Sequence, residues 1–218
     1  MLKRFYILWL FLALALSFWE SGINQDTLTR ISVLLFLCLT LLWSVRKSVS
    51  LGDPKKFFIT RGVCFAAVVE GCYMISKPVV DSLKIVPGMP FSRMLYNYSL
   101  DLIFTIPAYV LIFYVIWYLI NKYDYELWEY IVLMALGQAL GDGGFTFVAQ
   151  PLLLLLIPYV MTNYHAMNVA PYLMIRQTLP NGREKNLWRF VVPVILLPAT
   201  YLSAGMVIHT FTKLAGLE

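Results

Sequence analysis

Residues 127–175 decide the fold, and they read LWEYIVLMALGQALGDGGFTFVAQPLLLLLIPYVMTNYHAMNVAPYLMI. After Glu129 near its start, this stretch contains one acidic side chain, Asp142, and neither Lys nor Arg. A helix that crosses a membrane needs about 20 mainly apolar residues. The stretch is therefore long enough for two crossings, and we expect helices over residues 127–148 and 152–175.

The composition of the whole chain is typical of an integral membrane protein. Of its 218 residues, 60% are hydrophobic and 13% are charged, whereas soluble domains are about 45–50% apolar and about 25% charged. The formal net charge of +5 comes from short basic clusters between apolar runs, and these clusters form no continuous basic stripe. We therefore expect the lipid bilayer as a partner and no nucleic acid. Three cysteines without C-x-x-C spacing predict neither a disulfide framework nor a zinc site.

Seven apolar segments predict an all-α, polytopic membrane helix bundle that forms one integral membrane domain over residues 1–218. The first two segments are shorter than a full crossing, so flanking residues, including a snorkelling Arg30, must extend them. Prolines in the connection 76–92 argue against a continuous helix there. The expected helices are 5–18, 31–45, 57–75, 98–120, 127–148, 152–175 and 190–211.

The first of these helices has a competing interpretation as a cleaved signal peptide. Lys3 and Arg4 precede its apolar run, and Ala13 and Ala15 offer a small-x-small cleavage pattern. Trp19 at its end suits an interfacial anchor, and this favours a helix that is retained.

The distribution of basic residues predicts the orientation in the membrane. With a cytoplasmic N-terminus, the inside segments hold twelve of the 17 Lys and Arg residues. This excess supports a cytoplasmic N-terminus and an outside C-terminus, in the plasma (inner) membrane. An odd number of helices without a visible repeat argues against transporters built of inverted, matched halves.

Four titratable side chains then fall in the outer half of the bundle or at its outer interface: Glu70, Asp101, Asp142 and His209. Ionisable groups at membrane depth cost about 2.5–3.5 kcal/mol on insertion scales, so they usually face a cavity or a partner. Asp101 is expected in the first turn of its helix, where the helix dipole favours an acid, and His209 in interfacial water. Glu70 and Asp142 are our candidates for a shared site, with a polar clamp between helices as the alternative.

The residues around Asp142 suggest how such a site is built. Residues 137–141 form a small-xxx-small pattern, whose usual meaning is close helix packing. The two glycines after Asp142 remove side-chain shielding and helix propensity, so backbone groups could open towards a ligand. Gln138 precedes Asp142 by one helical turn and shares its face. The expected ligand-binding residues here are Gln138, Gly141, Gly143 and Gly144.

A second polar focus lies near the middle of the segment 152–175. Asn163, His165 and Asn168 occur within two turns, and Pro158 and Pro171 flank them. Their spacing allows hydrogen bonds along one helix surface. These side chains are either contacts between helices or the floor of a polar cavity, in which His165 could relay protons.

Familiar catalytic and metal-binding motifs are absent from the sequence. There is no H-E-x-x-H, G-x-S-x-G, Walker A or G-x-G-x-x-G motif. Two histidines at opposite predicted depths cannot form a multi-histidine metal site, although carboxylates could hold a hard cation. The sequence identifies no cofactor.

Three classes of function remain. The first is a protein that binds or transports a cation or small polar solute through a cavity open to the non-cytoplasmic side. The alternative is an intramembrane enzyme that acts on a lipid or prenyl-type substrate, with Glu70 and Asp142 as acid and base and His165 assisting. The second alternative is a structural subunit of a membrane complex or homo-oligomer. The first class needs no further motif, and we favour it.

Overall fold

The computed structural model describes residues 2–46 and 52–217, and this part of the chain is helical. It contains no β-strand, only one isolated bridge between Tyr123 and Glu184. Seven helices have 16 or more residues, as the sequence predicts. They are α1 (Leu2–Ser21), α2 (Gln25–Arg46), α3 (Pro54–Tyr73), α4 (Phe91–Lys122), α5 (Leu127–Asp142), α7 (Ile157–Ile175) and α8 (Trp188–Leu214). Shorter segments are η1 (Asp81–Leu83), α6 (Gly144–Ala149), η2 (Pro151–Leu156) and η3 (Arg176–Thr178).

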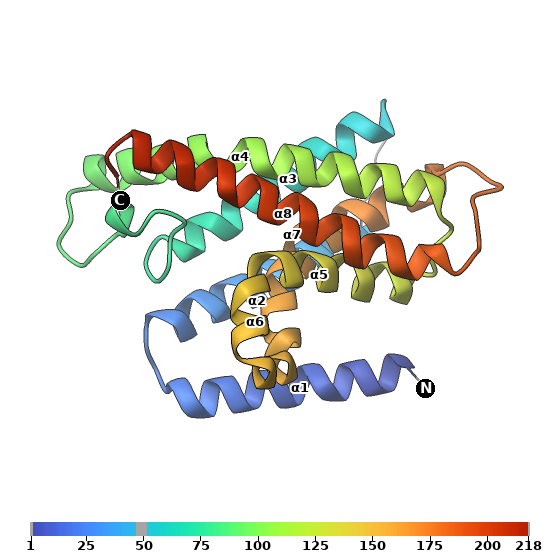
Figure 1. The fold of residues 1–218 in the computed structure, drawn as a ribbon, viewed down its shortest axis with the longest axis horizontal. Helices are drawn as coiled ribbons and strands as arrows, with labels where there is room; N and C mark the ends of the chain where they lie inside the picture. The colour runs from blue at the N-terminus through green and yellow to red at the C-terminus, as the bar shows by residue number, and fades with distance from the viewer. Residues whose placement is uncertain (1, 47–51, 218) are drawn as a thin grey trace.

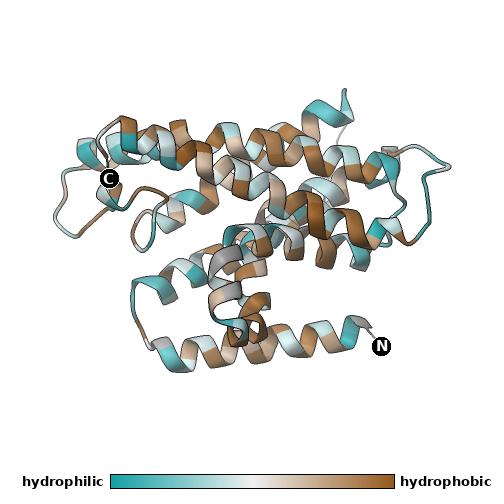
Figure 2. Cartoon of the chain, viewed as in Figure 1, coloured by the Kyte–Doolittle hydropathy of each residue, from teal (hydrophilic) through white to brown (hydrophobic). Residues whose placement is uncertain are grey.

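Four helical segments are long and apolar enough to cross a membrane, and this fits an integral membrane protein. They are Gln25–Ser44, Phe91–Lys122, Pro151–Thr178 and Trp188–Leu214. Apolar side chains such as Leu39, Ile103 and Ile195 point outward, and Figure 2 shows apolar residues along the outer helices. Outward apolar faces are what a helix needs where lipid replaces water as its solvent.

Local chemistry sets several helix boundaries. Asp53 precedes α3, and its carboxylate accepts hydrogen bonds from the backbone N–H groups of Lys55 and Lys56. This satisfies two of the N–H groups that a helix start leaves without partners. Glu126 and Glu129 form a capping box at the start of α5. One of the basic residues in the connection between α2 and α3, Lys47, lies outside the described residues.

Helix α4 begins seven residues earlier than the sequence predicts. Pro90 is its N-cap residue and the helix starts at Phe91, because the polar residues after Pro90 have no property that stops a helix. Asp101 therefore lies in the helix interior, three turns from the start. Our placement of Asp101 in the first turn was wrong.

Helix α5 is shorter than predicted, since it ends at Asp142 and not near residue 148. Gly143 caps it, the short α6 follows, and the 3-10 segment η2 leads into α7 at Ile157. Glycine has low helix propensity, and proline at position 151 lacks the N–H that a continuing helix requires. The regular α-helix therefore ends directly after Asp142.

The long helices run back and forth between two ends of the molecule, with the two termini at opposite ends (Figure 1). Helix α7 lies at the centre and packs against α1, α2, α3 and α5, while α8 covers α5 and α4. Helix α5 stops near the middle of the molecule, where α6 turns away from it (Figure 1). The break after Asp142 therefore lies near the middle of the molecule along its longest axis (Figure 1).

Two ion pairs tie the connections together at the end that we predict to be cytoplasmic. Arg183 Nη2 lies 2.9 Å from Asp124 Oδ1, and Arg189 Nη2 lies 2.7 Å from Glu129 Oε1. The backbones of residues 122–124 and of Glu184 also exchange two hydrogen bonds. These contacts fix the start of α5 and the start of α8 relative to each other.

Candidate functional site

Glu70 on α3 lies within electrostatic range of two other acids, Asp101 on α4 and Asp142 on α5, and we refer to these three residues as the carboxylate cluster. Glu70 is 7% exposed, and its Oε1 accepts a hydrogen bond from the hydroxyl group of Tyr109 on α4. Like charges at this depth repel each other unless a positive group neutralises them.

Asp101 is fully buried within this cluster. Among the described residues, no group makes a well-formed hydrogen bond to either of its carboxylate oxygens, although the backbone amides of Val79 and Val80 lie near them. A buried carboxylate without firm partners is costly. Asp101 is thus a buried acid and not an interfacial one, because the earlier start of α4 moves it inside the bundle.

Asp142 ends α5 and keeps an exposed side chain. Tyr164 on α7 places its hydroxyl group within reach of the carboxylate, and Arg30 and Lys77 interact with it electrostatically. Asp142 therefore lies among polar residues of several helices and can still be reached from outside the protein. The helix break after Asp142 leaves this end of α5 uncovered.

Gln138 lies one turn before Asp142 and is fully buried. Its Nε2 donates to the carbonyl oxygen of Met134 at 2.9 Å, and its Oε1 accepts from the hydroxyl group of Tyr201 on α8 at 3.3 Å. The ring of Tyr201 packs edge-on against that of Tyr164, with 5.7 Å between the ring centroids. Gln138 therefore connects α5 to the tyrosines that surround Asp142.

The glycines of α5 have two different roles in the structure. A Cβ atom on Gly137 would lie 2.7 Å from the carbonyl oxygen of Pro193, and one on Gly141 would lie 2.5 Å from Cβ of Tyr201. These two glycines allow α8 to approach α5, which is the packing role expected of a small-xxx-small pattern. Gly143 caps α5, and Gly144 begins α6. The packing against α8 fully accounts for Gly141.

Sequence reasoning missed Arg30 on α2, which is a buried cation near the cluster. It is 4% exposed, so our prediction that it snorkels to the interface was wrong. Its Nη1 donates to Thr162 Oγ1 at 2.6 Å and to Asn163 Oδ1, and its Nη2 donates to the Tyr73 hydroxyl group at 2.9 Å. Helix α2 packs against α7, which turns Arg30 inward. The signal in the sequence was an arginine inside an apolar segment, because such a residue usually faces the interior of a helix bundle.

The other candidates on α7 face elsewhere. His165 is buried, and its Nε2 shares a hydrogen bond of 2.5 Å with the hydroxyl group of Tyr6 on α1. Asn168 is buried as well, and its backbone oxygen accepts from the Tyr130 hydroxyl group at 3.3 Å. In the part of the chain that the structure describes, no interaction joins His165 to Glu70 or Asp142. The structure therefore brings Asn163 to the cluster through Arg30, but not His165 or Asn168.

The remaining predicted ligand residue, His209, is exposed near the C-terminal end of α8. It lies three residues before Thr212, whose hydroxyl group donates to its backbone oxygen at 3.0 Å. Within residues 2–46 and 52–217, no three His, Cys, Asp or Glu side chains are close enough to hold a metal ion. The chemistry that the site offers is therefore hydrogen bonding and charge, from carboxylates, tyrosines and one guanidinium.

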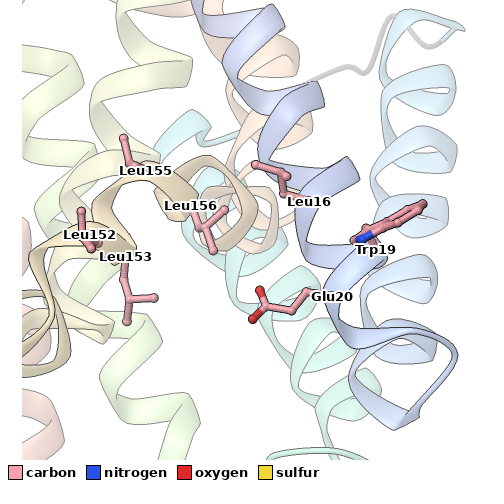
Figure 3. Close-up of a pocket in the computed structure, with 7 residues that line it drawn as sticks. All are labelled: Leu16, Trp19, Glu20, Leu152, Leu153, Leu155 and Leu156. Atoms are coloured by element: carbon pink, nitrogen blue, oxygen red, sulfur yellow. The ribbon is translucent and has the colours of Figure 1, made fainter.

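A separate pocket of about 670 Å³ opens between the end of α1 and η2. Figure 3 shows the carboxylate of Glu20 and the indole of Trp19 beside a group of leucines. The leucines are Leu16, Leu152, Leu153, Leu155 and Leu156. Two aromatic rings connect the end of α1 to Arg30: Phe18, which precedes the lining residue Trp19, packs on Tyr159 with 6.4 Å between the ring centroids, and the Arg30 guanidinium lies 3.9 Å from the centre of the Tyr159 ring. The lining suits an apolar chain.

Neither a family model, nor a curated protein, nor a solved structure matches this chain.

Proposed function

We propose that this protein binds and transports a cation or small polar solute through the carboxylate cluster. In this proposal the chain crosses the plasma membrane seven times, with its N-terminus in the cytoplasm and the cluster accessible from outside. The observation that carries the proposal is that buried Glu70 on α3 has two further acids within electrostatic range, Asp101 on α4 and Asp142 on α5, in an apolar bundle. Because buried carboxylates are costly, their retention at one place points to a positively charged ligand.

The exposed position of Asp142 supports access to this ligand. The carboxylate lies where α5 ends and the chain turns into α6, so no further turn of α5 covers it. Helix ends and irregular backbone at membrane depth are tolerated where they line a water-filled space. Asp142 is thus the entry group of the proposed site, and Glu70, held by Tyr109, is the inner group.

Polar atoms along α7 support transport in preference to binding alone. In the described part of the chain, the buried Nδ1 of His165 and the side-chain amide of Asn168 have no hydrogen-bond partner. Buried polar groups of this kind are normally satisfied by ordered water. Residues 165, 168 and 172 share one stripe of α7 that leads towards the ion-paired end of the molecule. In this proposal, water along the stripe would form the part of the path that leads to the ion-paired end, and Asn163, which Arg30 contacts, would join it to the carboxylate cluster.

One observation favours the alternative of an enzyme that acts on a lipid. The leucine-lined pocket near the end of α1 suits an acyl or prenyl chain, and two aromatic rings connect that end of α1 to Arg30. An enzyme would need the head of that lipid to reach Glu70 and Asp142. Release of a modified product from a lipid substrate, with loss of release in Glu70→Gln, would favour this alternative.

Ligand-dependent thermal stability tests the proposal. A ligand that binds only the native state raises the melting temperature as its concentration increases. We expect ethanolamine, used as a small cationic probe, to stabilise the wild type but neither Glu70→Gln nor Asp142→Asn. Asp81→Asn, which changes an exposed acid of η1, is the matched control and should respond like the wild type. Equal responses of all four proteins would contradict the proposal.

A further inference from the structure

Arg30 is a buried cation whose charge no neighbouring carboxylate neutralises directly. Its hydrogen-bond acceptors, on Thr162, Asn163 and Tyr73, are all neutral. The two ion pairs found among the described residues involve other arginines, at the far end of the helices. A buried charge of this kind is costly unless it is paired. The site therefore holds a positive group that is ready for an anionic partner.

The arginine also has free hydrogen-bonding capacity in a specific geometry. Its Nε is buried and has no partner in the described part of the chain. Its Nη2 carries two N–H groups and donates one of them to Tyr73. The Nε–H lies on the same edge of the planar guanidinium as one of the two Nη2–H groups. Two parallel donors at that edge match the two oxygens of a carboxylate or phosphate.

The neighbours of Arg30 hold this edge in place. Tyr159 covers the face of the guanidinium at 3.9 Å, and the two acceptors on α7 fix Nη1. A guanidinium that is already oriented loses little entropy when it binds an oxyanion. The contacts from α7 and α3 therefore prepare the free edge for a ligand.

We infer that the ligand of the proposed site is zwitterionic, with an oxyanion held by the free edge of Arg30 and a positive group held by the carboxylate cluster. This inference rests on the proposed function. Arg30 donates to Tyr73, which lies one turn after Glu70 on α3, and to Asn163, the neighbour of Tyr164 on α7. Tyr164 packs on Tyr201, whose hydroxyl group donates to Gln138 one turn before Asp142. These contacts place the guanidinium and the carboxylates around one region of the bundle. The ligand is either a free zwitterion or the headgroup of a zwitterionic lipid, whose chains would occupy the leucine-lined pocket.

The test compares three soluble probes by thermal stability: ethanolamine, phosphoethanolamine and inorganic phosphate. We expect phosphoethanolamine to bind wild-type protein about tenfold or more tightly than ethanolamine, as a pair of charge-assisted hydrogen bonds would provide. Arg30→Gln should reduce the affinity for phosphoethanolamine to that for ethanolamine. If this variant does not fold, the difference in affinity between phosphoethanolamine and ethanolamine on the wild type tests the inference by itself.

A second comparison, between two lipids, shows whether the zwitterion is a lipid headgroup or a free molecule. In nanodiscs, phosphatidylethanolamine should raise the melting temperature relative to phosphatidylglycerol if the ligand is a lipid headgroup, and it should have no such effect if the ligand is free. Equal affinity for ethanolamine and phosphoethanolamine, with no preference for phosphatidylethanolamine, would overturn the inference and leave the proposed function standing. No stabilisation by any probe or lipid would overturn both.

Discussion

Replacement of Gly141 by alanine should destabilise the bundle, because α8 packs directly on this residue. A Cβ atom at position 141 would lie 2.5 Å from Cβ of Tyr201 and 2.9 Å from Cα of Pro198. Real Cβ atoms essentially never approach other heavy atoms this closely. Both neighbours are backbone or near-backbone atoms, so no side-chain rotation relieves the contact and α5 and α8 must move apart.

The size of the effect follows from this displacement. Overpacking of a well-packed interior costs about 1–3 kcal/mol, while the change from glycine to alanine gains about 1 kcal/mol of helix propensity at most. With a propensity gain of about 0.5 kcal/mol at this buried site, the net loss is about 0.5–2.5 kcal/mol. For a chain of this length, 1 kcal/mol shifts the melting temperature by about 2–4 °C. A fall of several degrees is expected.

Thermal unfolding in detergent, followed by the fluorescence of the six tryptophans, measures this change. Gly205→Ala is the matched control, since it also lies in a helix and a Cβ atom there would meet nothing within 4 Å. It should leave the melting temperature unchanged or raise it slightly. If Gly141→Ala is as stable as Gly205→Ala, the close packing of α5 on α8 is refuted.

Two further substitutions test contacts that hold the site and the helix ends. Tyr109→Phe removes the hydrogen-bond donor to buried Glu70 and should lower the free energy of unfolding by about 1–3 kcal/mol. Tyr96→Phe, at an exposed position, is the control and should change it little. Denaturant or thermal unfolding measures the difference, and equal stability of the two variants would contradict the contact. Arg189→Gln breaks a largely buried ion pair with α5 and should cost more than the roughly 0.2–1 kcal/mol of an exposed pair. Exposed Lys185→Gln is its control, and no difference between them would contradict the pair's role.

The sequence predicts the helices well because membrane-length apolar segments carry a strong signal. Errors occur where a boundary depends on one residue: Pro90 starts α4 earlier than expected, and Gly143 ends α5 earlier. Both residues are recognisable in the sequence. Whether each of them starts or ends a helix depends on the packing around it, which the sequence does not show.

The candidate site was predicted in part. Glu70, Asp101 and Asp142 were identified because ionisable groups are rare in apolar segments, and the structure brings them within electrostatic range. Arg30 was placed at the interface, because which face of α2 points inward depends on its contact with α7. His165 was grouped with the polar cavity from its spacing to Asn168, yet it faces α1. Spacing along one helix does not determine which neighbour each face meets.

The central claim is that the carboxylate cluster opens to the outside of the membrane. Asp142→Cys, in a chain whose three native cysteines are replaced by serine, should react with a membrane-impermeant thiol reagent added to intact cells. Asp81→Cys, in the connection that we predict to lie outside, should react from the same side, and Ala166→Cys, at a fully buried position, should not. Labelling of Asp142→Cys from outside is the predicted result. Labelling only from the cytoplasmic side, in inverted vesicles, would contradict the account.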